Sequence, residues 1–535
     1  MPAAAASTHA PLPAASLARS IEAFLADHPR AVVMEDGQLL FDLRLDHCSI
    51  TADRGRCLLH LWSAERNLVR TVYGLQPRRD TLRLETRRFG QSRPQILTLV
   101  PDPDFRTPTA RDTARRRYQR TLEQALAAQF PEWKPESFRS AMDLEHSFGP
   151  AYARGLLVRG QSAWAITGVG PEEPPSVIEG SLTLGLLWLA YCREHANRRV
   201  VHGLKLVVPA GSAAVARARM AWLNPGLAQW ELWELHPSTA ELTACSIAQD
   251  GNLDIQCPHA FDPQAALDRC RLGIDHLHAL LPPELLAATE MRAHSATQVG
   301  FSLHGLEYAR VRHGLAPGSF ARHDAIYFGA GPSETLLDET TEDLFLDLID
   351  RLFRSRACDG LARDPLYRLQ PERWLESVLR RDLSLLGADF AGGTNGAPVY
   401  SQVPAFASAS RTLLDLLTVT RQGRLAVLEL KADDDLHLPL QALDYWARVR
   451  TLHRAGEIAR RGYFPGVELS AEDPLLFLVA PALHIHPANE AILRHLSPAI
   501  PWHFLAVDER WRTDCRVILR KHATEAGPSR PGLLP

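Results

Sequence analysis

The chain has 535 residues, of which 46% are hydrophobic and 23% charged, and its formal net charge is −3. Domains usually hold roughly 100 to 200 residues, so this length predicts about three of them. The near-neutral balance excludes a protein that binds nucleic acid through its global charge, so any such affinity has to come from local patches. No stretch of about 18 uninterrupted apolar residues occurs, which predicts that the chain neither spans nor partners a membrane.

The first 18 residues are rich in Ala and Pro and lack the basic start and the apolar run of a secretion signal. We expect residues 1–18 and the tail 523–535 to be disordered, because they hold too few apolar residues to offset the entropy of ordering. The eight cysteines form no CxxC pair and no cysteine–histidine spacing suited to zinc. They indicate reduced thiols and hence a cytoplasmic protein.

Residues 19–112 show short alternating apolar runs separated by turn signals, which predicts a small β-rich domain. Arginine is concentrated here, because the segment from Arg54 to Arg120 holds 16 Arg and 6 acidic residues, a local balance of +10. Arginines that neutralise phosphates release counterions, so this surface is a candidate nucleic-acid-binding face. An ordinary solvated surface is the equally weighted alternative. The candidate residues are Arg78, Arg79, Arg87, Arg88, Arg115, Arg116 and Arg117.

Residues 113–260 contain a weak internal repeat of the C-terminal region. The run LKLVVPA at 204–210 mirrors LFLVAPA at 476–482. By the same correspondence, residues 162–169 take the place of a later strand that carries Glu429, but they hold none of its charged residues. We therefore expect a degenerate second copy of the C-terminal α/β fold, kept for architecture or for nucleic-acid contact.

Residues 261–356 combine helical signals over 265–281 and 341–354 with a strand at 325–328. We expect this mixed region to connect the two halves of the chain.

The most informative pattern lies in residues 357–522. Pro371 opens a segment with an apolar helical stripe, which predicts a helix that extends to about Leu386. A predicted strand over 411–420 then carries Asp415, and a second strand over 424–431 carries Glu429 and Lys431.

The turn between these strands decides whether the two acids converge. If residues 421–423 form a three-residue loop with Gly423 in the left-handed conformation, Thr420 pairs with Arg424 and Asp415 falls opposite Glu429. Lys431 then shares the face of Glu429, because alternate residues of a strand point the same way. A two-residue loop would instead put Asp415 on the other face.

Two opposed carboxylates repel one another unless a divalent cation lies between them. Carboxylate oxygens suit Mg²⁺ or Mn²⁺, which take waters and substrate phosphate oxygens as further ligands. We therefore predict metal ligation by Asp415 and Glu429. Lys431 is one of only four lysines in the chain, and at this position it can orient the attacking water or offset transition-state charge.

A further helix is predicted from Pro439 to about Gly456. Gln441 and Tyr445 are one turn apart on it and can both face the edge of the sheet, where ordinary helix surface is the alternative. The preceding Asp433 to Asp435 are expected to form a solvated loop.

In this order the residues resemble the PD-(D/E)XK nuclease superfamily, in the branch with the QxxxY element of RecB-type nucleases, and they are also similar to NucS-type endonucleases. The resemblance covers about residues 371–522 and implies an α/β fold with a restriction-endonuclease-like αβββαβ core. The catalytic set that it implies is Asp415, Glu429, Lys431, Glu376, Gln441 and Tyr445. Glu372 is the alternative to Glu376 as the helix acid. Relatives with an iron–sulfur cluster use four cysteines around the nuclease, whereas only Cys358 and Cys515 flank it here, so we expect no cluster.

Our first hypothesis is a Mg²⁺-dependent deoxyribonuclease that hydrolyses phosphodiester bonds of DNA in repair or in defence. The sequence leaves open whether RNA is also a substrate, whether cutting starts at ends, and the oligomeric state. The alternative is a non-catalytic nucleic-acid-binding protein that retains a nuclease fold. A third hypothesis is an α/β interaction protein in which the polar residues are accidental.

Overall fold

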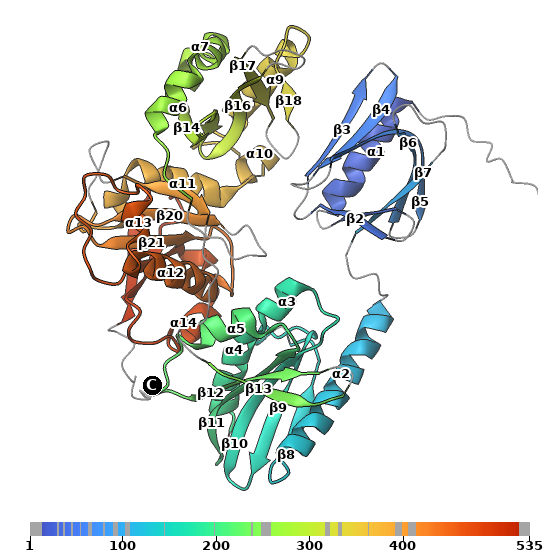
Figure 1. The fold of residues 1–535 in the computed structure, drawn as a ribbon, viewed down its shortest axis with the longest axis vertical. Helices are drawn as coiled ribbons and strands as arrows, with labels where there is room; N and C mark the ends of the chain where they lie inside the picture. The colour runs from blue at the N-terminus through green and yellow to red at the C-terminus, as the bar shows by residue number, and fades with distance from the viewer. Residues whose placement is uncertain are drawn as a thin grey trace, which may run out of the picture.

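A computed structural model of the chain describes residues 13–28, 31–35, 38–43, 47–53, 55–62, 67–78, 81–88, 95–101, 108–143, 145–196, 198–236, 239–247, 258–315, 322–329, 334–361, 363–390, 398–404 and 413–523. The protein is a mixed α/β structure with four β-sheets, each in its own part of the sequence (Figure 1). No helix within these ranges combines the length and the apolar character needed to cross a bilayer.

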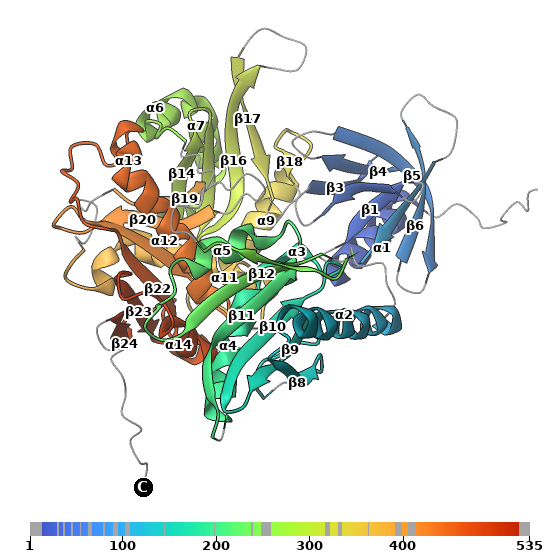
Figure 2. The ribbon, with the colours of Figure 1, turned by 60° about the horizontal axis from the view of Figure 1, so that its bottom comes forward.

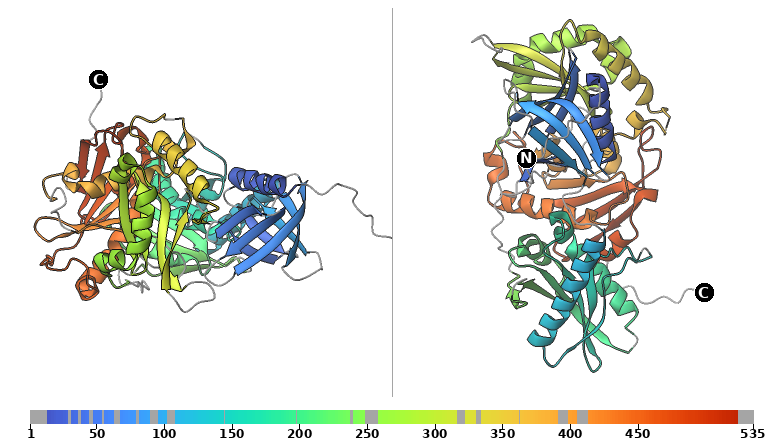
Figure 3. Two further views of the ribbon diagram at one scale, coloured as in Figure 1. Left: turned by 90° about the horizontal axis from the view of Figure 1, so that it is seen from above. Right: turned by 90° about the vertical axis from the view of Figure 1, so that its right-hand side faces the viewer.

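The first unit is an antiparallel seven-stranded sheet in the order β2-β1-β7-β6-β5-β4-β3. Helix α1 covers one side of the curved sheet (Figure 3) and contacts β3, β4 and β5. This helix begins at Ala14, so the prediction that residues 1–18 are disordered is wrong from that residue on. The elements are α1 (Ala14–Asp27), β1 (Val32–Glu35), β2 (Gln38–Asp42), β3 (His47–Asp53), β4 (Arg56–Trp62), β5 (Asn67–Arg78), β6 (Thr81–Arg88) and β7 (Gln95–Val100).

The second unit is a six-stranded sheet in the order β13-β12-β11-β10-β9-β8, with α2 on one face and α4 on the other. Helix α2 begins at Pro108, five residues before the predicted domain boundary. The elements are α2 (Pro108–Gln129), β8 (Lys134–Arg139), β9 (Tyr152–Arg159), β10 (Ser162–Val169), α3 (Pro175–Glu179), α4 (Ser181–Glu194), β11 (Val200–Pro209), α5 (Ala213–Met220), β12 (Gln229–Leu235) and β13 (Leu242–Cys245).

The third unit has helices and a strand where the sequence predicts them, over 265–281, 341–354 and 325–328. Its five strands form an antiparallel sheet in the order β14 to β18, and its buried residues make a hydrophobic core of their own. The long hairpin of β16 and β17 is clearest in Figure 2. The elements are α6 (Pro263–Arg269), α7 (Arg271–Leu280), α8 (Pro283–Ala288), β14 (Thr289–Ser295), β15 (Gln298–Leu303), β16 (Leu306–Leu315), β17 (Arg322–Phe328), β18 (Thr335–Leu336) and α9 (Glu342–Ser355).

The C-terminal unit is a six-stranded sheet in the order β19-β20-β21-β22-β23-β24, with α11 and α12 on opposite faces. Helix α11 ends at Arg381 rather than continuing to Leu386, because Asp382 takes an extended conformation and caps the short helix η1. The elements are α10 (Pro365–Arg368), α11 (Pro371–Arg381), η1 (Leu383–Leu386), β19 (Tyr400–Pro404), β20 (Leu413–Val419), β21 (Leu425–Leu430), α12 (Leu438–Arg454), α13 (Glu457–Arg460), β22 (Leu475–Pro481), η2 (Ala482–His484), α14 (Ala488–Leu493), β23 (Trp502–Val507) and β24 (Val517–His522).

The second and C-terminal sheets have the same topology. Each begins with three antiparallel strands, adds two parallel strands after helical crossovers, and ends with an antiparallel edge strand. In each, one helix before the first strand covers one face and the first crossover helix covers the other. The internal repeat predicted from the sequence is therefore present as two copies of one strand order.

Candidate functional site

The hairpin of β20 and β21 has the register predicted from the sequence. The amide of Thr420 donates to the carbonyl of Arg424 at 2.8 Å, and Gly423 has a φ of +75°. A Cβ at Gly423 would lie 2.1 Å from the carbonyl oxygen of Glu468, so glycine is required for both conformation and space. The strands pair from Val419 to Leu416, and one further step sets Asp415 opposite Glu429.

Asp415 and Glu429 lie at the end of this hairpin in a largely buried position. Asp415 accepts a hydrogen bond from the amide of Leu430 at 2.9 Å and one from the side-chain amide of Gln402 at 3.3 Å. Glu429 is only 4% exposed, and its Oε2 atom has no hydrogen-bond partner in the described structure. A buried carboxylate oxygen without a partner is costly, so this atom is a candidate ligand atom for a bound cation.

Burial and the nearby negative charges raise the pKa of both acids. Burial, with a further contribution from Glu376, raises the pKa of Asp415 to about 6. Burial and the neighbouring Asp415 raise the pKa of Glu429 well above its ordinary value. In the absence of a cation, at least one of the two carboxyls therefore holds its proton more tightly than a free carboxyl does.

Lys431 places a positive charge beside the carboxylate pair. Its Nζ lies 3.9 Å from Glu429, 3.7 Å from Glu372 and 3.7 Å from Asp435. Burial lowers the pKa of this ammonium, but the surrounding carboxylates outweigh burial and raise it, so Lys431 stays charged. The expectation of a fully solvated loop is wrong for Asp435, which faces the lysine, although Asp433 and Asp434 are exposed.

Glu376 joins the site from α11 and is already occupied by positive partners. It accepts hydrogen bonds from Gln402 at 2.9 Å and from Arg373 at 3.1 Å, and Arg292 of β14 lies 3.6 Å away. Gln402 therefore bridges Glu376 and Asp415. Sequence reasoning missed both Gln402 and Arg292, because a lone Gln in a short strand and an Arg from another sheet carry no local signal.

Helix α12 brings Gln441 and Tyr445 toward the same face of the sheet. Tyr445 is buried, and its pKa is raised by burial and by the charges of Glu429 and Asp415. Gln441 is half-buried, one turn earlier on the helix. His437, which precedes the helix, bonds through its ring to the hydroxyl of Thr183 at 3.0 Å and so contacts the second unit.

The donor set of this site fits a hard divalent cation. Among the described residues no group of three or more His, Cys, Asp or Glu side chains surrounds a metal position. Mg²⁺ usually takes only one or two protein carboxylates and completes its shell with water and phosphate oxygens. Asp415 and Glu429 supply that number, and the Oε2 of Glu429, which has no partner among the described residues, is available to coordinate a cation.

The arginines predicted to bind nucleic acid have different surroundings. Arg115 donates to Glu173 at 2.7 and 3.1 Å and is thus part of an internal ion pair, whereas Arg116 and Arg117 are exposed on α2. Arg87 is exposed and lies over the ring of Tyr73 at 4.7 Å. Arg79 and the side chains of Arg78 and Arg88 lie outside the described residues.

Replacing Asp415 by Asn tests the electrostatics of the site through stability. A folded-state pKa near 6, above the ordinary value of 3.8, makes the metal-free protein lose stability as the pH rises from about 4 through 6. We expect Asp415→Asn to raise the free energy of unfolding at pH 8 by about 1–3 kcal/mol without metal. The gain should vanish at pH 4. Chemical denaturation at both pH values measures it.

Asp473→Asn is the matched control on the same unit. Although burial opposes it, hydrogen bonds from Arg450 and Arg454 lower the pKa of Asp473, so its substitution should destabilise the protein at pH 8. A destabilising Asp415→Asn at pH 8 would contradict the assignment of a strained carboxylate pair.

Comparisons of the chain with protein-family models, with curated proteins and with solved structures find no match. The function of the site therefore has to be inferred from its own residues.

Proposed function

We propose that the protein is a metal-dependent nuclease that hydrolyses phosphodiester bonds of DNA, with its active site at the end of the β20–β21 hairpin. The observation that carries the proposal is the buried pair of Asp415 and Glu429 beside Lys431, in which Glu429 Oε2 has no hydrogen-bond partner within the part of the chain that the structure describes. Such a pair is unfavourable in an isolated protein and becomes favourable with a divalent cation and an anionic substrate.

We further propose that residues 357–522 form the restriction-endonuclease-like core that the sequence resemblance implies. Support comes from the strand order, from the helix α11 with its acid Glu376, and from α12 with Gln441 and Tyr445 over the same sheet. The same resemblance leads us to propose DNA rather than RNA as the main substrate.

Each residue has a role that follows from its surroundings. The amide of Leu430 donates a hydrogen bond to Asp415 and so fixes the orientation of this carboxylate, which can then bind a cation. Glu429 offers its unpartnered oxygen to the same cation. When bound, Mg²⁺ or Mn²⁺ supplies Lewis-acid chemistry, because it polarises a phosphate oxygen and lowers the pKa of water.

Lys431 contributes a positive charge that forms three ion pairs with carboxylates, each too long for a direct hydrogen bond in the described structure. Its three carboxylate neighbours are all 3.7 Å or more away, so its N–H groups remain available to a water or a phosphate oxygen. There it can orient the attacking water and offset the charge that develops on the phosphate in the transition state. Glu376 is held by Gln402 and two arginines, and we propose that it positions Asp415 through Gln402.

The direct test is cleavage of labelled linear DNA and of circular single-stranded and duplex DNA with Mg²⁺ or Mn²⁺. We expect cleavage that EDTA stops and that Asp415→Ala abolishes. Cutting of circles would identify an endonuclease. If no DNA is cut but binding persists with a steep salt dependence, the protein is a nucleic-acid-binding protein with a nuclease fold.

The exposed arginines of α2 give a separate prediction for DNA binding. Arg116→Ala combined with Arg117→Ala should weaken duplex binding about equally for all sequences and reduce the salt dependence of the affinity, because phosphate contacts carry no sequence information. Arg351→Ala is the control, since Arg351 is an exposed arginine of the third unit paired with Asp347. Equal binding by the double variant and the wild type would remove α2 from the interface.

A further inference from the structure

The second and C-terminal units contact one another as two halves of a symmetric dimer do. Leu223, after α5, and Leu496, after α14, form an antiparallel β-bridge, and they begin the matching sequences Leu-Asn-Pro and Leu-Ser-Pro. The flanking hydrogen bonds are Asn224 N to His495 O at 2.8 Å and Ser497 N to Trp222 O at 2.7 Å. Each bond is the image of the other when the two units are exchanged, which is the mark of a two-fold axis.

The helices around the bridge repeat this relation. Helix α14 contacts α4, and α12 contacts α5, so the first crossover helix of each unit meets the second crossover helix of the other (Figure 1, Figure 2). A single hydrophobic core includes residues from both units, with the rings of Trp222 and Trp446 4.9 Å apart. The chain thus contains a pseudo-dimer with a permanent interface.

Only one half of this pseudo-dimer holds the carboxylate pair. Thr167 of β10 pairs with Leu206, three residues before the proline that ends β11, and Glu429 pairs with Leu478, three residues before the proline that ends β22. Thr167 therefore takes the place of Glu429. By the same correspondence Val169 takes the place of Lys431.

The residue in the place of Asp415 reverses the charge. Arg154 pairs with Thr167 across the β9–β10 hairpin, as Asp415 lies opposite Glu429. It is 1% exposed and stacks over the ring of Phe148 at 4.7 Å. A fixed guanidinium at this position repels a divalent cation, so the second unit cannot repeat the metal chemistry proposed for the C-terminal unit.

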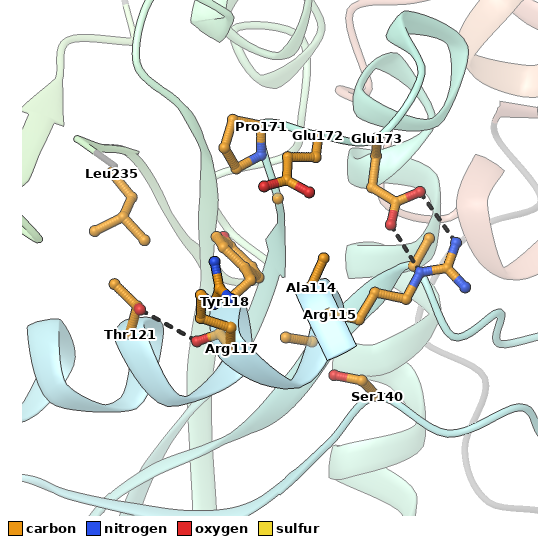
Figure 4. Close-up of a pocket in the computed structure, with 13 residues that line it drawn as sticks. Ala114, Arg115, Arg117, Tyr118, Thr121, Ser140, Pro171, Glu172, Glu173 and Leu235 are labelled. Atoms are coloured by element: carbon orange, nitrogen blue, oxygen red, sulfur yellow. Dashed lines mark hydrogen bonds and ion pairs between the residues drawn. The ribbon is translucent and has the colours of Figure 1, made fainter. Parts of the chain in front are cut away.

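The helix that corresponds to α11 also differs between the two units. Where α11 presents Glu372 and Glu376, the start of α2 presents Arg115 and Tyr118 to a cavity of about 200 Å³ at the end of β10 (Figure 4). Glu173 in this cavity is bound by Arg115, as the dashed lines in the figure show. The cavity therefore does not rebuild the lost carboxylate pair.

The loop that follows the strand of Glu429 contacts the start of α4 in the second unit. His437, between the catalytic strand and α12, bonds to Thr183 of α4, and its ring borders Gly180 at the start of α4. The two strands of duplex DNA are themselves related by two-fold axes. Two protein units that are related by a two-fold axis can therefore each contact one DNA strand.

We propose that the protein is a nicking endonuclease, which engages duplex DNA with both halves of the pseudo-dimer and hydrolyses only the strand that meets the C-terminal half. This proposal rests on the proposed nuclease function. In the reaction a water oxygen joins phosphorus, one P–O bond breaks, and a phosphate monoester and a hydroxyl result, with one water proton going to the hydroxyl and the other to solvent. The second unit binds the opposite DNA strand without cutting it.

Cleavage of supercoiled plasmid by the full-length protein with Mg²⁺ tests the proposal. We expect relaxed circles to accumulate first, at a rate proportional to protein concentration, and linear plasmid to appear only after a lag as nicks coincide. Thr167→Val should cut within about two-fold of the wild-type rate, because it removes a buried hydroxyl that has no partner among the described residues. Glu429→Gln in the catalytic half should abolish both products.

The outcomes separate the two proposals. Linear plasmid formed without a lag, or at a rate that rises with the square of protein concentration, would overturn nicking but leave the nuclease function standing. Cleavage of single-stranded circles alone would do the same. Loss of activity in a folded Thr167→Val protein would show that the second half takes part in the chemistry and would also overturn nicking. Absence of any cleavage would remove the proposed function itself.

Discussion

Lys431→Ala is expected to reduce the rate of DNA cleavage by about 10² to 10³-fold while leaving the protein folded. The reason is that Lys431 lies beside the carboxylate pair, 3.9 Å from Glu429. The carboxylates around Lys431 all stand 3.7 Å or more away, so its N–H groups can reach the phosphate. Removing it deprives the developing charge on the phosphate of its stabilising partner. Single-turnover cleavage of labelled DNA at saturating protein measures the chemical step without the contribution of product release.

Lys521→Ala is the matched control for this variant. Lys521 is the other lysine of the C-terminal unit, and it forms a surface ion pair with Glu490 at 2.6 Å on the edge strand β24. Its loss should change the rate by less than about two-fold, since exposed pairs contribute little. Equal loss of activity in both variants, or none in Lys431→Ala, would remove Lys431 from the catalytic set.

Breaking the buried ion pair between the two halves should have the largest effect on stability. Arg219 of α5 is 7% exposed, and it binds Asp444 of α12 through three contacts of 2.8 to 3.2 Å and the carbonyl of Glu179 at 2.7 Å. Removing one partner of such a pair leaves an uncompensated charge, so Arg219→Ala is expected to cost about 3–5 kcal/mol. Urea denaturation measures the free energy of unfolding.

The double variant decides whether the pair itself is responsible. Arg219→Met with Asp444→Leu should recover most of the loss, because no charge is left without its partner. Arg494→Ala, which breaks the exposed pair with Glu490, should cost less than about 1 kcal/mol. Additive losses in the double variant would mean that packing, not the ion pair, joins the halves at this point.

The sequence was most informative where local geometry determines the structure. The glycine at 423 fixes a three-residue loop, and from the loop the register of Asp415 and Glu429 follows without any knowledge of the rest of the fold. The repeat was also predictable, because the strands that precede Pro209 and Pro481 keep the same apolar pattern. Both predictions depended on residues close together in the chain.

Contacts between distant segments were not predictable in this way. Arg292 lies 84 residues before Glu376 in the chain, in a sheet whose separate core the sequence patterns did not reveal. Gln402 has a positive φ of +54°, a conformation that glycine or asparagine can signal in a sequence but that glutamine does not. The reversal of charge at Arg154 became visible only from strand pairing, because the sequence comparison had aligned β10 but not its partner β9.

Binding of Mn²⁺ to the protein without DNA tests the central claim most directly, because it does not depend on the choice of substrate. Titration calorimetry at pH 8 should show binding to the wild type that both Asp415→Asn and Glu429→Gln abolish and that Thr167→Val leaves unchanged. Binding should weaken as the pH falls toward 6 and below, because protons compete with the cation for both Asp415 and Glu429. Mn²⁺ binding that persists in both carboxylate variants, or DNA cleavage that persists in EDTA, would contradict a metal-dependent nuclease at this site.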